Sequence, residues 1–483
     1  MKNYYKILSI VLITFFTSCG DDYLSVNPST AVGDAVVIET ASDVANALNG
    51  AYDILTDKNY YQGDYLMIAD MMGDDFLNPT WSSNWLNGYY NYSWTKISSS
   101  QSDQYEVIFY GINHINEILA KTSKIEQSAE ITNYVAQLRA LRALMYFDIV
   151  RMYGPLYVNL GKGDISADAL GVSILREPVE DVFASFYRDK TSDVYDFIIG
   201  ELEEVVNDVN ASVNNGYMNK YAVEALMARV YLYMGNNTKA FDMAKDVIDC
   251  VYYSLLSYDD YVASWKEQYT TESIFELAVS ADDNESWDNI GYYVDPEGYK
   301  EAIATDDFVQ LMTADPTDVR FGLLTYDESV DAYYPNLKYP GRGDKVFVNN
   351  PKIFRLSEMY LIAAEAALKN GNSTLAGTYL SDLREKRSTT EPRKYESSVS
   401  IDDILYERRL ELFCEGHRAW DLWRNQRSVV RYTSASEKLE KRHTDVSGGT
   451  IEFDNYKTIA PILEREIELI PKEDRDSQQN PGY

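Results

Sequence analysis

Two stretches of the chain carry small and apolar residues at the same offsets, in a pattern typical of paired helices. The first set is Ala228, Tyr231, Gly235, Ala240, Ala244 and Val247, and the second is Ala364, Ala367, Gly371, Ala376, Leu380 and Leu383. Small residues let two antiparallel helices approach closely, and a Gly closes the turn between them. The pattern therefore predicts two helical hairpins of the tetratricopeptide type.

A third helix is predicted from Val135 to Tyr153, where apolar residues recur at helical spacing up to the Gly154-Pro155 stop. The segment from Asp103 to Ala120 is its expected partner. Because these segments are scattered rather than tandem, we expect no regular solenoid. The stretches between them are rich in Tyr, Asn, Gly and Asp, and we expect them to fold as excursions packed on a helical scaffold.

The N-terminus predicts export and lipidation. Lys2 and Lys6 precede a short apolar run, and Cys19 stands where cleavage is expected. A cysteine at that point is typical of a bacterial lipoprotein signal, although an ordinary signal peptide with a chance cysteine is the alternative. We expect a signal peptide at 1–18, a lipidated tether at 19–39 and a single domain at 40–483.

The charge balance argues against nucleic acid as a partner. The chain has 44 basic and 76 acidic residues, a net charge of −32. Such a surface repels phosphate backbones, and solubility outside the cell explains it without a special partner.

Near the C-terminus, glutamates and arginines recur at helical spacing. Glu407, Glu411 and Glu415 are four residues apart, with Arg408 and Arg409 among them. A catalytic carboxylate site is one interpretation, but buried ion pairs are favoured. Trp420 and Trp423 are expected to anchor the same region to the scaffold rather than to bind ligand.

Motifs for catalysis or for metal binding are weak. His114, His417 and His443 each stand alone, and only Cys250 and Cys414 follow Cys19, each in a helix-like run where a small buried hydrophobe is expected. The acidic clusters at 74–75 and 282–285 could hold calcium, although solvated loops are favoured. We therefore predict no catalytic residue, no metal site and no cofactor.

Six segments, spread over the chain, carry distinctive motifs: Leu138 to Pro155, Phe354 to Ala366, Glu407 to Leu412, Glu415 to Arg418, Asp421 to Arg424 and Gln479 to Tyr483. Together they resemble the SusD/RagB family of Bacteroidetes outer-membrane lipoproteins. The resemblance implies a mostly α-helical SusD-like fold, with four tetratricopeptide-like helix pairs as scaffold and loop-rich, Tyr/Trp-rich excursions with a few short strands. It also implies no enzymatic activity.

The same resemblance implies a location and a partner. The protein would be lipid-anchored in the outer membrane and exposed at the cell surface, and Asp21-Asp22 after Cys19 resembles the acidic signal for that destination. It would capture a nutrient oligomer and act as the lid of a SusC-like TonB-dependent outer-membrane barrel. The ligand would be a glycan, or an oligopeptide as in the RagB-like branch; a secreted glycan-degrading hydrolase is the less favoured alternative.

The candidate ligand-binding residues come from the aromatic content, which includes 41 Tyr and seven Trp. One cluster, between Met72 and Ser98, offers Trp81, Trp85 and Tyr89, and another, between Asp282 and Tyr299, offers Trp287 and Tyr292. Flat rings stack on the apolar faces of sugars or on peptide planes, while neighbouring Asn and Asp side chains hydrogen-bond hydroxyls. Alternatively, these rings fix long loops to the helices or dock on the barrel.

Overall fold

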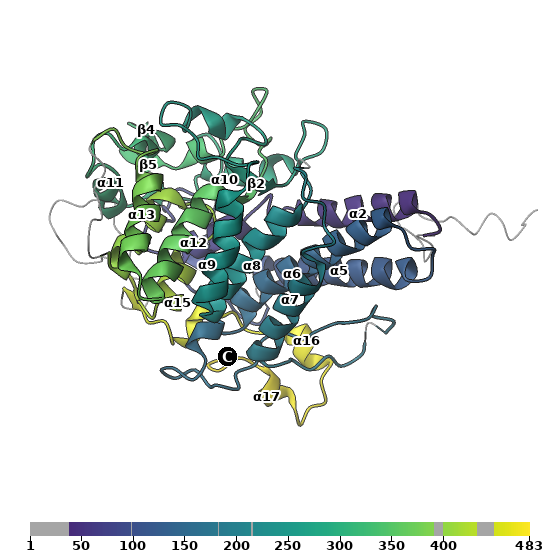
Figure 1. Ribbon diagram of the computed structural model, residues 1–483. Helices are drawn as coiled ribbons and strands as arrows, with labels where there is room; N and C mark the ends of the chain where they lie inside the picture. The colour runs from purple at the N-terminus through teal and green to yellow at the C-terminus, as the bar shows by residue number, and fades with distance from the viewer. Residues whose placement is uncertain (1–37, 98, 182, 214–215, 391–398, 432–448) are drawn as a thin grey trace, which may run out of the picture.

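The computed structural model describes residues 38–97, 99–181, 183–213, 216–390, 399–431 and 449–483. Within these ranges the chain is mostly helical (Figure 1). The longer helices are α2 (Ala41–Leu55), α5 (Ser99–Thr122), α6 (Ala129–Tyr153), α7 (Thr191–Val205), α8 (Lys220–Met234), α9 (Asn237–Asp249), α12 (Leu356–Lys369), α13 (Ser373–Arg384) and α14 (Ile401–Glu411). Shorter ones are α3 (Tyr65–Met71), α4 (Asn87–Tyr90), α10 (Ile290–Val294), α11 (Asp306–Met312), α15 (Arg418–Arg424), α16 (Glu464–Glu468) and α17 (Arg475–Gln478).

Both predicted helical hairpins are confirmed. The first is α8 with α9, and the second is α12 with α13. Gly235 and Gly371 lie between the paired helices with φ of +73° and +83°, the left-handed backbone that glycine adopts most readily. Ala228 and Ala364 are fully buried, as expected for positions where helices approach closely. In Figure 1 the two hairpins stand side by side, in teal and green.

The predicted third helix is α6, and its partner is α5. Ser128 caps the start of α6 by accepting a hydrogen bond from the Ile131 amide, and the helix ends at Gly154. Almost every side chain in its last four turns is buried, because α2, α5 and α7 all pack on this helix. How many tetratricopeptide-like pairs the scaffold holds stays a prediction.

The strands are short, as expected, and each described strand pairs with one other strand in a two-stranded sheet. They form the antiparallel pairs β1 (Phe76–Leu77) with β3 (Ile303–Ala304), β2 (Ser273–Glu276) with β6 (Lys352–Arg355), β4 (Thr325–Asp327) with β5 (Ala332–Tyr334), and β7 (Val429–Val430) with β8 (Thr450–Ile451). In Figure 1, β4, β5, α10 and α11 gather at the top of the view, over the helical scaffold. These excursions position the site described below.

The C-terminal glutamates and arginines form buried ion pairs, which confirms the structural interpretation. Glu411 accepts hydrogen bonds from Arg320, Arg355 and Arg387, and Arg355 also binds Glu415. Only part of the expected helix forms, because α14 ends at Glu411 and Glu415 lies in the turn that follows. Removing one partner from such a network costs about 3–5 kcal/mol, because a charge is left buried and unpaired. Trp420 and Trp423, which lie on α15, are also buried, as predicted.

Two minor expectations were wrong. Asp74 and Asp75 form no solvated loop, because Asp75 is fully buried and the pair binds Arg418 and Arg409 from the C-terminal region. Cys250 is only half-buried, since it lies after the last residue of α9, whereas Cys414 is buried.

Among the described helices, none combines the length and the apolar character needed to cross a bilayer. Cys19 and the proposed boundary between the signal peptide (1–18) and the tether (19–39) lie outside the described residues.

Candidate ligand-binding platform

Five aromatic rings from separate excursions form one continuous row on the surface. We call this row the aromatic platform; it consists of Trp85, Tyr299, Tyr292, Trp287 and Phe347. The ring centroids of successive members are 6.0, 4.8, 4.7 and 5.7 Å apart. Trp85 and Trp287 are 52% and 54% exposed, while the three rings between and beside them are half-buried. The platform thus offers two outward-facing indoles on a supported base.

The first excursion is attached to the second by backbone pairing. Strand β1 pairs with β3, with Leu77 opposite Ile303. The Ser83 amide donates to the Tyr299 carbonyl at 3.0 Å, immediately before the loop that carries Trp85. Because of these contacts, Trp85 and Tyr299 are neighbours although they are far apart in the sequence.

The Trp287 side of the platform is held by buried amide side chains. Asn289 accepts a hydrogen bond from the Gly291 amide and so caps α10, which carries Tyr292. Gln62 accepts from the Glu285 amide at 3.0 Å and from the Asn289 side chain at 3.1 Å. These bonds fix the 3-10 turn Ser286–Asp288, and with it the Trp287 ring. A ring held in this way loses little conformational entropy when a ligand binds.

Polar and acidic groups border the rings. Lys58 contacts Asp288 at 3.5 Å, an exposed pair that contributes little to stability. The pKa of the Tyr299 hydroxyl is raised by burial and by nearby Asp288, and the pKa of the Glu285 carboxyl is raised by burial and by Asp57. The platform therefore combines flat apolar faces with hydrogen-bonding groups at its border, an arrangement that suits a ligand with an apolar face and polar edges.

The five residues predicted from the sequence are placed differently from one another. Trp85, Trp287 and Tyr292 come together in the aromatic platform. Trp81 is 43% exposed, but its indole nitrogen donates to the Tyr334 hydroxyl at 3.1 Å and it is not part of the row of rings.

Tyr89 is a correction to the sequence prediction. It is only 1% exposed, and its hydroxyl donates to Asp64 at 3.3 Å, so its ring has no face free for a ligand. The short helix α4 turns it into the core beside Leu86 and Tyr90. Two platform residues, Tyr299 and Phe347, were missed as candidates; Tyr299 stood at the end of the second aromatic cluster, while Phe347 had no such signal.

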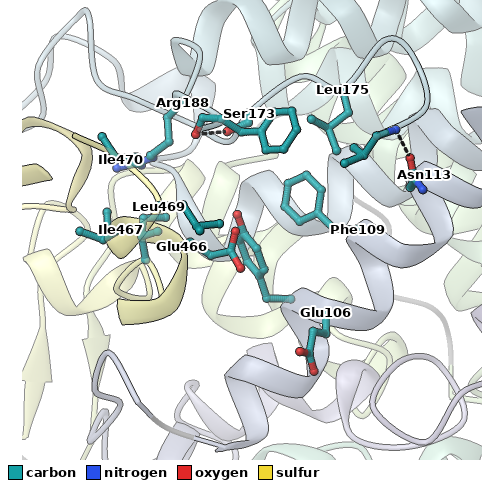
Figure 2. A pocket seen from close by; sticks show the side chains of 14 residues that line it. Glu106, Phe109, Asn113, Ser173, Leu175, Arg188, Glu466, Ile467, Leu469 and Ile470 are labelled. Atoms are coloured by element: carbon teal, nitrogen blue, oxygen red, sulfur yellow. Dashed lines mark hydrogen bonds between the residues drawn. The ribbon is translucent and has the colours of Figure 1, made fainter. Parts of the chain in front are cut away.

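A pocket lies elsewhere, between α5, the segment 173–188 and the α16 region (Figure 2). It is a pocket of 270 Å³ lined largely by apolar side chains, with Phe109 from α5 facing Leu469 and Leu175. The pKa of Glu466 in its wall is raised by burial. In Figure 1, α16 is at the bottom of the view and α10 is at the top, so this pocket is separate from the aromatic platform. No group of His, Cys, Asp and Glu among the described side chains has the geometry of a metal site.

Comparisons with known proteins agree with this fold. Two family models match: the SusD family over residues 330–483, and the family described as starch-binding, associating with the outer membrane, over residues 22–232. A SusD superfamily protein of Bacteroides vulgatus has 31% sequence identity and a TM-score of 0.82, covering 92% of this chain and 100% of that one. The chain belongs to the SusD family. Its resemblance to that family, inferred from the sequence, is therefore confirmed, and so is the mostly helical SusD-like fold.

Two more distant matches are a curated relative and a solved structure that is named for its ligand. A SusD-like protein of Formosa agariphila is 24% identical over 87% of this chain and 91% of its own length. The structure of a laminarin-binding SusD-like protein matches with a TM-score of 0.71 at 23% identity, covering 92% of this SusD family member and 100% of the other chain. At that identity the second likeness concerns the fold alone.

Proposed function

We propose that this SusD family member binds a glycan oligomer at the cell surface, with the aromatic platform as its ligand-binding site. The observation that carries the proposal is the continuous row of rings from Trp85 to Phe347, with its two exposed indoles. Sugar rings present flat C–H faces that stack on aromatic rings, and their hydroxyls need polar partners at the edges. A surface row of rings suits an extended oligomer better than a compact ligand, which favours an enclosed pocket.

A wider role is proposed on the basis of the family. We propose a lipoprotein anchored through Cys19 in the outer membrane that delivers its ligand to a SusC-like TonB-dependent transporter and acts as its lid. The family description, which names the outer membrane, supports the location. The proposed role is binding and not catalysis. A single domain over 40–483 is part of the same proposal.

Calorimetric titration of the purified mature protein tests the binding role. Laminarin oligosaccharides are the first probe because a relative of the same fold is named for laminarin, starch oligosaccharides are the second, and a set of oligopeptides is the third. Trp85→Ala and Trp287→Ala should each weaken glycan binding about thirtyfold, a loss of about 2 kcal/mol that is typical of a central aromatic contact. Trp81→Ala reports whether the ligand extends past the platform.

Phe183→Ala is the matched control, because Phe183 is a strongly exposed ring outside the platform. Its affinity and melting temperature should equal those of the wild type. The proposal is contradicted if both platform variants keep full affinity for a glycan that the wild type binds. Binding of oligopeptides in place of glycans would move the protein to the RagB-like alternative, and turnover of a glycan during the titration would favour the hydrolase.

A further inference from the structure

Glu301 is a buried carboxylate whose hydrogen bonds go to the excursion that carries Trp85. It is fully buried and lies two residues after Tyr299. Its Oε2 accepts from the Leu86 amide at 2.9 Å and from the Asn78 side chain at 3.0 Å. The same Asn78 amide group also donates to the Glu301 backbone carbonyl at 2.8 Å.

Among the buried glutamates of the described chain, Glu301 is set apart by the lack of a cationic partner. Buried glutamates elsewhere in the described chain contact arginine or lysine; examples are Glu272, Glu276, Glu358, Glu365, Glu407, Glu411 and Glu415. Glu301 forms no ion pair with any described residue, and its Oε1 has no hydrogen-bond partner among them. Burying a carboxylate without a cation is costly, so the core packing alone does not account for an acid at this position.

Hydrogen bonds to Tyr299 and to Glu301 hold the two ends of the Trp85 loop. On one side of Trp85, the Ser83 amide is held by the Tyr299 carbonyl, and on the other side the Leu86 amide is held by the Glu301 carboxylate. Asn84, between these two anchors, has φ of +65°, a left-handed conformation that the surrounding contacts must maintain. A charged acceptor makes a stronger hydrogen bond to a backbone amide than a neutral one does.

We propose that Glu301 is a positioning residue, which holds Trp85 beside Tyr299 and thereby sets the affinity of the aromatic platform without touching the ligand. The inference rests on the proposed function. A ring that is already ordered in the free protein loses less entropy on binding, whereas a mobile ring must be immobilised by the ligand.

The first test needs no ligand. The protein is labelled with 5-fluorotryptophan, and the Trp85 resonance is assigned from Trp85→Phe. In Glu301→Ala that resonance should shift or broaden, while those of the buried Trp420 and Trp423 stay in place. Glu301→Gln, which keeps a neutral acceptor of the same size, should show a smaller change. An unchanged Trp85 resonance in both variants overturns the proposal.

The second test measures affinity for laminarin oligosaccharides. Glu301→Ala should weaken binding about two- to tenfold, with partial rescue in Glu301→Gln. Glu224→Ala is the matched control, because Glu224 is also a buried glutamate but lies on α8 in the scaffold, and it should leave affinity unchanged. If the Trp85 resonance moves in Glu301→Ala but the affinity for laminarin oligosaccharides equals that of the wild type, the role of Glu301 in binding is contradicted. If the wild type binds no glycan, the proposed function fails, and the fluorine resonance alone decides whether Glu301 positions Trp85.

Discussion

Glu411 illustrates how the interior of this protein holds full charges. It is fully buried at the end of α14, and three arginines keep the pKa of its carboxyl well below the usual range. The same arginines also bind Asp318 and Glu272, so each charge has more than one partner. Such a network fixes the orientation of the elements that contribute to it, although a well-packed apolar replacement could be equally stable.

Asp64 is buried without a cationic partner among the described residues, and this makes stability depend on pH. Burial raises the pKa of its carboxyl to about 7, whereas the unfolded chain titrates near about 3.9. Between these values the folded state binds more protons, so this group lowers stability progressively as pH rises and adds no further loss above the folded pKa.

We therefore expect Asp64→Asn to gain stability relative to the wild type as the pH rises from about 4 to about 8. Each unit of pKa difference is worth about 1.4 kcal/mol, so the total change is a few kcal/mol. The Tyr89 hydroxyl can still donate to the amide oxygen of the variant. Urea denaturation across this pH range measures the effect. A constant difference between the two proteins at every pH would refute it.

The sequence could suggest which residue types bind but not which rings face outward. Trp85 and Tyr89 stood in one cluster, yet α4 turns Tyr89 into the core while Trp85 stays on the loop before it. That difference depends on a helix of a single turn, which has no periodic signal. In the same way, Asp74 and Asp75 gave no local indication that their partners are arginines near the other end of the chain.

The turns of the helical hairpins provide a test at the level of secondary structure. Gly371 has φ of +83° and a Cβ added there would meet no described atom within 4 Å, so a substitution there changes only the backbone energy. Gly371→Ala should destabilise the protein by about 1–2 kcal/mol, because an L-residue is strained in this conformation. Equilibrium denaturation measures the change.

Gly200 is the matched control for that experiment. It lies within α7, and a Cβ added there would also meet no described atom within 4 Å. Because its backbone is helical, Gly200→Ala should stabilise the protein by about 1 kcal/mol. Changes of the same sign in both variants would contradict the assigned turn geometry.

The helices were predictable because their signals are local. Small residues, a capping Gly and apolar spacing all lie within one hairpin, and α8, α9, α12 and α13 formed where they were expected. The joining of the two aromatic excursions was not predictable, since it depends on β1 and β3, which have two residues each and are far apart in the sequence. Strands of that length carry no alternation pattern to read.

For the molecule as a whole, the proposed lipid anchor makes a prediction about location. Cys19→Ala should release the protein from the membrane fraction, because the thiol that would carry the lipid is removed and the strongly acidic chain is not attracted to anionic lipid. Cell fractionation followed by immunoblotting measures the change, with Cys250→Ala as the control that keeps its anchor. If the Cys19 variant remains in the outer-membrane fraction of cells that lack the barrel partner, the anchor is elsewhere.

The most direct test of the ligand-binding role is a crystal structure of the mature protein with the glycan oligomer that binds most tightly. We predict sugar density stacked on Trp85 and Trp287 along the aromatic platform, with hydroxyls facing the polar groups at its border. A ligand seated in the pocket between α5 and α16, with the platform unoccupied, would contradict the account.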